Sequence, residues 1–282
     1  MNNVWIRSIM ARRKINEESS KIGSMRRLKL SSFKGLDKFH AALANDRLPD
    51  MVRWLKSKKK SQLLMEEVRK HIFDLGPPTP PGRGTGRKNY HQRLIYHLAE
   101  IQTTLDTMRD IEFYMGRFPY SEAKVARHRH LMFHVQAFLN ELYILQERLL
   151  QLLAFIERQH RKDARLDHIK DVCAVLKNFV TDSMKKGVAI RGRHVHQWRL
   201  SDNDHDRLIG MSLHMMTPSG SVQRAFKVYY DSEYKRIRRS RREWVASGIG
   251  VSQELVDAYF DELFNLVFDD KGRLVYPSQL KF

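Results

Sequence analysis

The sequence predicts an all-α protein, an antiparallel helical bundle with a long helical hairpin, preceded by a basic helical N-terminal extension. Apolar residues recur at alternating steps of three and four over long stretches, which is the spacing of one face of an α-helix. Half of the eight prolines are confined to one short segment. No region is rich in strand-forming residues, apart from a short piece at Arg273–Tyr276.

A segment rich in proline and glycine, residues 76–88, divides the chain. It contains four prolines and four glycines, which the interior of neither a helix nor a strand tolerates. We therefore expect a linker at 76–88, between an N-terminal region of residues 1–75 and a helical bundle of residues 89–282. Within the N-terminal region a short helix is predicted at Leu36–Asn45.

The chain is strongly basic, with 51 Lys and Arg against 32 Asp and Glu and a formal net charge of +19. Residues 1–75 alone hold 18 basic and 8 acidic residues. Such an excess indicates a polyanionic partner, and we expect RNA or another nucleic acid. The run Lys58, Lys59 and Lys60 lies in a second helix predicted from Pro49 to about Phe73, and it is either a phosphate contact or a solvated helix face.

Two long helices are predicted directly after the linker. The first spans Asn89 to about Tyr114 on an apolar stripe of Leu94, Leu98, Ile101, Leu105 and Met108. The second begins after an N-cap at Ser121, and its stripe consists of Leu131, Val135, Phe138, Leu142, Leu145, Leu149, Leu152 and Ile156. Long neighbours joined by a short turn predict an antiparallel hairpin, with Leu98, Leu105, Phe138, Leu142, Leu145 and Leu149 buried between helices.

Three more helices complete the predicted bundle. One runs from about Asp167 to Met184 on Ile169, Val172, Leu176, Phe179 and Val180, and the single cysteine, Cys173, falls inside this pattern as an expected core residue. The C-terminal helices, within 220–270, are expected at Val222–Val245 and Ser252–Val267.

The stretch from Arg191 to His196 carries the chemistry that the sequence suggests. A histidine with a pKa near neutrality can transfer protons to and from ribose oxygens, and an arginine can hold the scissile phosphate. RNA cleavage without a metal needs little more, because the 2′-hydroxyl is itself the nucleophile. We expect Arg191 and His196 to be the catalytic pair, assisted by His194 or Arg193.

An arginine and a following histidine with four residues between them, late in a helical domain, resemble the motif of the HEPN superfamily (higher eukaryotes and prokaryotes nucleotide-binding domain). The resemblance covers residues 89–215. It implies a metal-independent endoribonuclease that acts as a homodimer, with two motifs paired across the interface. In the family a polar residue commonly follows the arginine. Gly192 stands there in this chain, and Arg193 and His194 supply an Arg–polar pair two residues later.

The sequence also allows other functions and ligands. A non-catalytic all-helical module that binds nucleic acid or protein fits the same composition. Two histidine groups suggest a metal, namely His128, His130 and His134, and His194 and His196 with Asp202 and Asp204. Arginines flank the first group and no carboxylate completes it, while the acidic stretch of the second equally suits a capping loop. We therefore expect no metal and no cofactor.

A second basic footprint lies in the run from Lys235 to Arg242, with Arg238, Arg239, Arg241 and Arg242 as candidate nucleic-acid contacts. On a helix this run points in nearly every direction, so part of it must pair with carboxylates or face solvent. No apolar run is long enough to span a bilayer and no signal-like segment opens the chain, so we expect a cytoplasmic protein without membrane contact.

Overall fold

The computed structural model describes residues 34–55, 86–117, 125–196, 203–215, 220–278 and 280, with only the backbone for residues 47–55, 88 and 193–196. These ranges contain six helices, which are α2 (Gly35–Leu55), α4 (Arg87–Met115), α5 (Arg127–Gln159), α6 (Leu166–His196), α7 (Asn203–His214) and α8 (Gly220–Val267). The only β pairing within them is one isolated antiparallel bridge between Phe268 and Leu274. The predicted all-α fold class is therefore confirmed.

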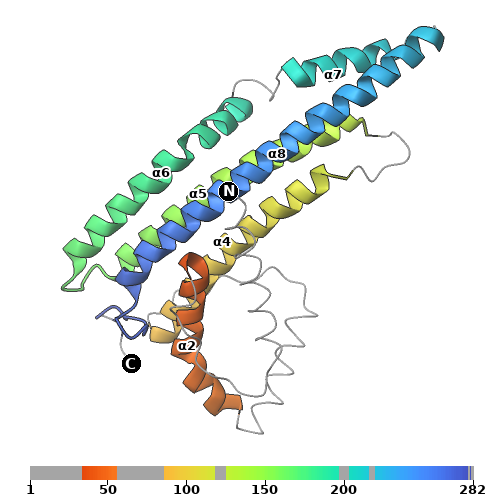
Figure 1. The fold of residues 1–282 in the computed structure, drawn as a ribbon. Helices are drawn as coiled ribbons and strands as arrows, with labels where there is room; N and C mark the ends of the chain where they lie inside the picture. The colour runs from red at the N-terminus through yellow and green to blue at the C-terminus, as the bar shows by residue number, and fades with distance from the viewer. Residues whose placement is uncertain are drawn as a thin grey trace.

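Helices α4, α5, α6 and α8 run side by side, while α2 lies across one end and α7 packs on the N-terminal half of α8 (Figure 1). Ring contacts show that α4 and α5 are antiparallel. Tyr90, early in α4, stacks on Phe155, late in α5, with 5.6 Å between the ring centroids. At the opposite end Tyr114 stacks on His134 with a centroid distance of 6.2 Å. The predicted helical hairpin is confirmed.

The predicted stripes form the core. The side chains of Leu98, Leu105, Phe138, Leu145 and Leu149 are at most 1% exposed, while Leu142 packs partly buried at the edge. Cys173 is also buried, and burial raises the pKa of its thiol to about 11, so it is a core residue as expected. Phe179 was wrongly assigned to the stripe, because its side chain is 38% exposed.

Helix α8 corrects the prediction of two C-terminal helices, because it continues without a break through Gly248 and Gly250. Gly248 faces α5. A Cβ atom at this position would lie 2.6 Å from Cζ of Phe138, which is too close for any real contact. The glycine therefore lets two helices approach each other, and it does not end the helix.

Helix α6 also runs beyond its predicted end at Met184, since Val188 and Ile190 continue its packing against the core. The Arg191–His196 motif is therefore part of this helix. Helix α4 begins at Arg87, so the last two residues of the predicted linker are helical.

Helix α2 corrects the expected start of a new helix at Pro49, because one helix runs from Gly35 through position 49 to Leu55. Four residues in its first half belong to the hydrophobic core and anchor it on α8 and α4, namely Leu36, Phe39, Ala42 and Leu43. Phe39 contacts the ring of Phe260 edge-on at a centroid distance of 5.2 Å. This part of the N-terminal region is therefore packed on the bundle. The remainder of the segment predicted to Phe73, including Lys58, Lys59 and Lys60, lies outside the described residues.

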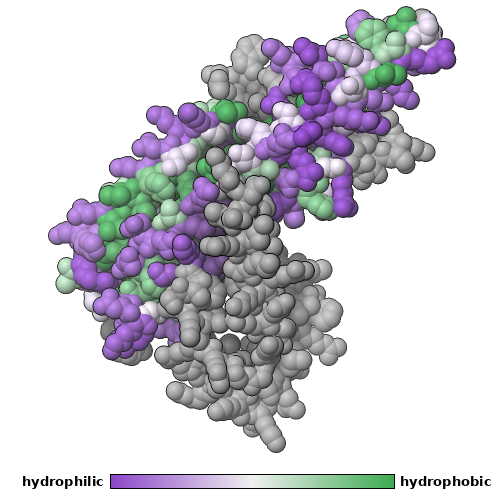
Figure 2. Space-filling view, viewed as in Figure 1, coloured by the Kyte–Doolittle hydropathy of each residue, from purple (hydrophilic) through white to green (hydrophobic). Residues whose placement is uncertain are grey.

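The outward faces of α6, α7 and α8 are mainly hydrophilic, with hydrophobic side chains gathered between α6 and α8 and at the tip of α8 (Figure 2). At that tip Leu213, Val222 and Val228 are exposed. None of the described helices is both long enough and apolar enough to cross a membrane.

Candidate nucleic-acid interface

Arg191 lies near the end of α6, against α5. Its Nε donates a hydrogen bond of 3.4 Å to Oδ1 of Asn140, and its guanidinium carbon lies 4.3 Å from the centre of the Tyr143 ring. No carboxylate pairs with it among the described side chains. Positions 191 and 196 belong to one helix, where five residues correspond to about 140° around the axis and about 7.5 Å along it. Positions 191 and 196 of the same chain therefore face different sides of α6. The side chains of Arg193, His194 and His196 lie outside the described part of the structure.

The arginines of the second basic footprint are largely engaged by acidic side chains. Arg242 pairs with Glu112 at 2.6 Å, Arg239 with Glu243 at 2.9 Å, and Arg241 with Asp204 of α7 at 3.5 Å. Arg238 instead lies over the ring of Tyr234, 5.6 Å from its centre. The expectation that part of this run pairs with carboxylates is confirmed. Because such pairs are exposed, each contributes only about 0–1 kcal/mol, and a phosphate can replace the carboxylate at little cost.

Three of these arginines line a groove between the end of α4 and α8, with a volume of about 580 Å³. We call it the basic groove; its lining residues are Glu112, Gly116, Lys235, Arg238, Arg239, Arg242, Glu243 and Ala246. Four cationic side chains face two carboxylates there, so the groove keeps a net positive charge. Arg241 is not part of it and points toward α7.

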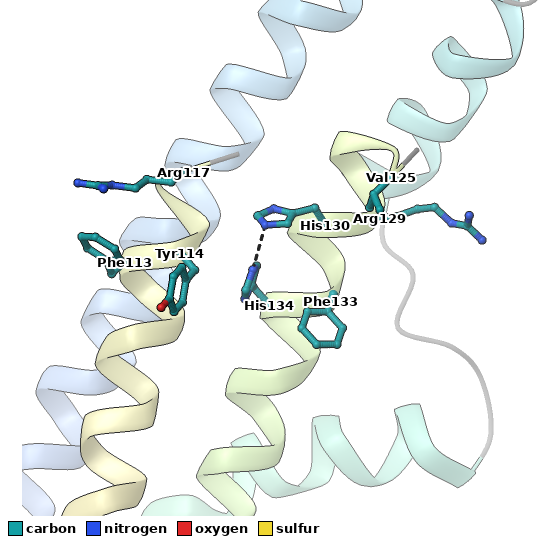
Figure 3. Close-up of a pocket in the computed structure, with 8 residues that line it drawn as sticks. All are labelled: Phe113, Tyr114, Arg117, Val125, Arg129, His130, Phe133 and His134. Carbon is teal, nitrogen blue, oxygen red and sulfur yellow. Dashed lines mark hydrogen bonds between the residues drawn. The ribbon is translucent and has the colours of Figure 1, made fainter. Parts of the chain in front are cut away.

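A second hollow of about 620 Å³ lies against the same last turn of α4 (Figure 3). We call it the aromatic pocket; it is lined by Phe113, Tyr114, Arg117, Val125, Arg129, His130, Phe133 and His134. Phe113, Tyr114 and Phe133 are 46%, 54% and 65% exposed. Large aromatic side chains are rarely left this open in a group, so the pocket offers stacking surfaces to a ligand.

Cationic and imidazole groups accompany the aromatic rings. The guanidinium of Arg117 lies over the Phe113 ring, 4.3 Å from its centre. His130 and His134 form a hydrogen bond between their Nε2 atoms, 3.1 Å apart. Burial lowers the pKa of both histidines, and that of His134 is lowered further by His130. Both imidazoles are therefore largely neutral at pH 7.

A third cluster of titratable groups is structural. The hydroxyl of Tyr90 is hydrogen-bonded to Nε2 of His160 at 3.1 Å, and Nδ1 of His160 to Asp163 at 3.2 Å. Burial lowers the pKa of His160, although Asp163 opposes this shift. Tyr90 and His160 are at most 2% exposed, so a substrate cannot reach them. This chain of hydrogen bonds ties the start of α4 to the turn between α5 and α6.

Sequence reasoning missed the aromatic pocket. Phe113, Tyr114 and Phe133 lie off the apolar stripes of their helices, which indicates that they face outward. This pattern does not show that the two helix ends meet, which depends on the register of the hairpin.

Comparison with known proteins does not identify the chain. No protein-family model matches it, and no curated protein and no solved structure shows significant similarity to it. The resemblance to the HEPN superfamily therefore stays a prediction. Among the described residues no group of three or more His, Cys, Asp or Glu side chains is placed to hold a metal ion.

Proposed function

We propose that this protein binds single-stranded RNA at the end of α4, with bases stacked in the aromatic pocket and phosphates held by the basic groove. The observation that carries the proposal is that both hollows adjoin the C-terminal end of α4. This end contributes Phe113, Tyr114 and Arg117 to the pocket, and Glu112 and Gly116 to the groove. Exposed aromatic rings beside a positively charged groove are the usual means of holding unpaired nucleotides.

The expected energies favour a single strand. Stacking of one base on an aromatic side chain contributes about 1–3 kcal/mol, whereas an exposed arginine–carboxylate pair that a phosphate must displace contributes at most about 1 kcal/mol. Bases can enter the pocket only when they are unpaired and unstacked, which is how proteins commonly recognise RNA loops and ends. The net charge of +19 adds long-range attraction for any nucleic acid.

The test is the salt dependence of binding to a fluorescent single-stranded RNA, measured by anisotropy between 50 and 200 mM salt. We expect affinity to fall steeply with salt, and we expect Arg238→Ala and Arg242→Ala each to flatten the logarithmic slope by about 0.7. Arg273→Ala is the matched control, because Arg273 is an exposed arginine paired with Asp269 at 2.7 Å, near the other end of α8. Salt-independent binding, or none at 50 mM salt, would contradict the proposal.

Endoribonuclease activity is a second candidate function. It is supported by the place of Arg191 near the end of the third long helix, with a guanidinium that no described carboxylate neutralises. In this reading Arg191 clamps the phosphate and His196 transfers protons, with help from Arg193 or His194. Because positions 191 and 196 face different sides of one helix, a shared site requires the motif of a second copy. The homodimer that the HEPN resemblance implies would supply it.

His196→Ala is expected to abolish cleavage of single-stranded RNA with little loss of affinity, because an imidazole that transfers protons does not bind the substrate. Arg191→Ala is expected to reduce both affinity and cleavage, and activity is expected to survive EDTA and to leave 2′,3′-cyclic phosphates. The control is His168→Ala, since Arg161 and His168 show a similar spacing in the sequence. A pure protein that leaves RNA intact would remove this candidate and leave the binding function standing.

A further inference from the structure

His130 and His134 are the only two histidines in the sequence that are four residues apart. Four residues is the spacing that places two side chains on the same face of a helix, one turn apart. Both belong to the first turns of α5, where they line the aromatic pocket from the side opposite Tyr114 (Figure 3). The helix therefore holds two imidazoles against an open hollow.

The distance between their Nε2 atoms suits chelation of one metal ion. The two nitrogens are 3.1 Å apart. With zinc–nitrogen bonds of about 2.0–2.1 Å, this separation corresponds to an angle of about 100° at the metal, between the square-planar and tetrahedral values. Coordination through Nε2 requires that the ring carries its proton on Nδ1. Nδ1 of His134 is buried without a hydrogen-bond partner among the described residues, so no described donor holds the ring in the opposite tautomer, with the proton on Nε2.

In the sequence, the arginines next to the two histidines would be expected to repel a metal cation. In the structure Arg127 is paired with Asp231 of α8 at 2.9 Å, which neutralises its charge. The guanidinium of Arg117 lies over Phe113, and Arg129 points away from the histidine pair (Figure 3).

We infer that His130 and His134 together bind one divalent transition-metal ion of the zinc, nickel and copper class, for which imidazole is a preferred ligand. The two Nε2 lone pairs replace the present hydrogen bond between the rings, and each ring carries its proton on Nδ1. Two protein ligands leave the other coordination positions open to the aromatic pocket. Water, or a phosphate oxygen of a bound ligand, can occupy them.

The experiment is a calorimetric titration of the full chain, freed of metal with a chelator, with zinc and separately with nickel in the absence of nucleic acid. We expect one site that His130→Gln and His134→Gln each weaken by roughly 10- to 100-fold, because even the loss of a group that only orients a ligand costs this much. His168→Gln is the matched control, since it removes one exposed histidine from α6 and leaves the pair intact.

A second measurement keeps the test independent of folding defects. At one fixed zinc concentration that saturates the parent chain, zinc is expected to raise the Tm of the parent chain and of His168→Gln by the same amount. The Tm of the two pair variants is expected to rise by less, because their affinity for zinc is lower. If zinc binds both pair variants as tightly as the parent, the ion lies elsewhere in this histidine-rich chain and the inference is wrong. Absence of any zinc or nickel binding by the parent would also overturn it. Neither outcome bears on RNA binding, which is measured separately.

Discussion

Replacing Leu145 with aspartate is expected to unfold the bundle. Leu145 is completely buried in the middle of α5, within the core cluster. A carboxylate at this place would be enclosed by the apolar side chains of the core cluster, so its burial costs several kcal/mol. Whole domains are stable by only about 5–15 kcal/mol, so this cost consumes much of the total. Thermal and urea unfolding followed by circular dichroism measure it.

Val175→Asp provides the control for this substitution. Val175 is on α6 and its side chain is 67% exposed. This substitution also replaces a branched apolar side chain with aspartate, but the new carboxylate is in contact with solvent. We expect its free energy of unfolding to stay within about 0.5 kcal/mol of the parent value. If Leu145→Asp unfolded at the same temperature as the parent, the apolar stripe of α5 would have to face solvent, and the packing of α5 described here would be wrong.

Gly248→Ala and Gly250→Ala are expected to change stability in opposite directions, although the two positions are two residues apart in α8. In a helix interior alanine is more favourable than glycine by about 0.5–1 kcal/mol. A Cβ atom at Gly250 meets nothing within 4 Å, so this variant is expected to gain that amount. A Cβ atom at Gly248 would lie 2.6 Å from the Phe138 ring, so overpacking of about 1–3 kcal/mol is expected to exceed the gain.

The free energies of unfolding of both variants, from urea titrations, decide this prediction. Each glycine serves as the control for the other, because helix propensity changes equally at both positions and only the neighbours differ. Stabilisation by both substitutions would show that α8 does not pack closely on α5 at Gly248. Destabilisation by both would instead favour a break in α8, as the sequence suggested.

The helical hairpin could be predicted from the sequence, whereas the ends of several helices could not, and the difference has a physical reason. Burial of one face imposes the spacing of three and four on Leu98, Leu105, Leu145 and Leu149, and that spacing is visible without any structure. A glycine or proline is ambiguous, since it can end a helix or lie inside it where packing requires. The sequence predicts a break between Val245 and Ser252 and a new helix at Pro49. Instead α8 continues through Gly248, which packs against Phe138, and α2 continues through position 49.

The candidate site was only partly accessible to sequence reasoning. Because the run from Lys235 to Arg242 points in nearly every direction on a helix, part of it was expected to pair with carboxylates or face solvent, and Arg239, Arg241 and Arg242 are indeed paired. Glu243, the partner of Arg239, lies four residues further along the same helix, whereas Glu112 and Asp204 lie on other helices and could not be foreseen. The aromatic pocket depends on which residues of α4 and α5 meet at one end of the hairpin, and this follows from register and not from residue types.

Ultraviolet cross-linking tests whether single-stranded RNA binds at the end of α4, as proposed. A uridine-rich single strand would be irradiated with the full chain, and the modified peptides would be identified by mass spectrometry. Phe113, Tyr114 and Phe133 are the exposed rings on which bases are proposed to stack. Adducts are therefore expected in residues 113–117 and 125–134, and they are expected to disappear when Phe113→Leu and Phe133→Leu are combined. Adducts confined to other segments, with none at the aromatic pocket, would contradict the account.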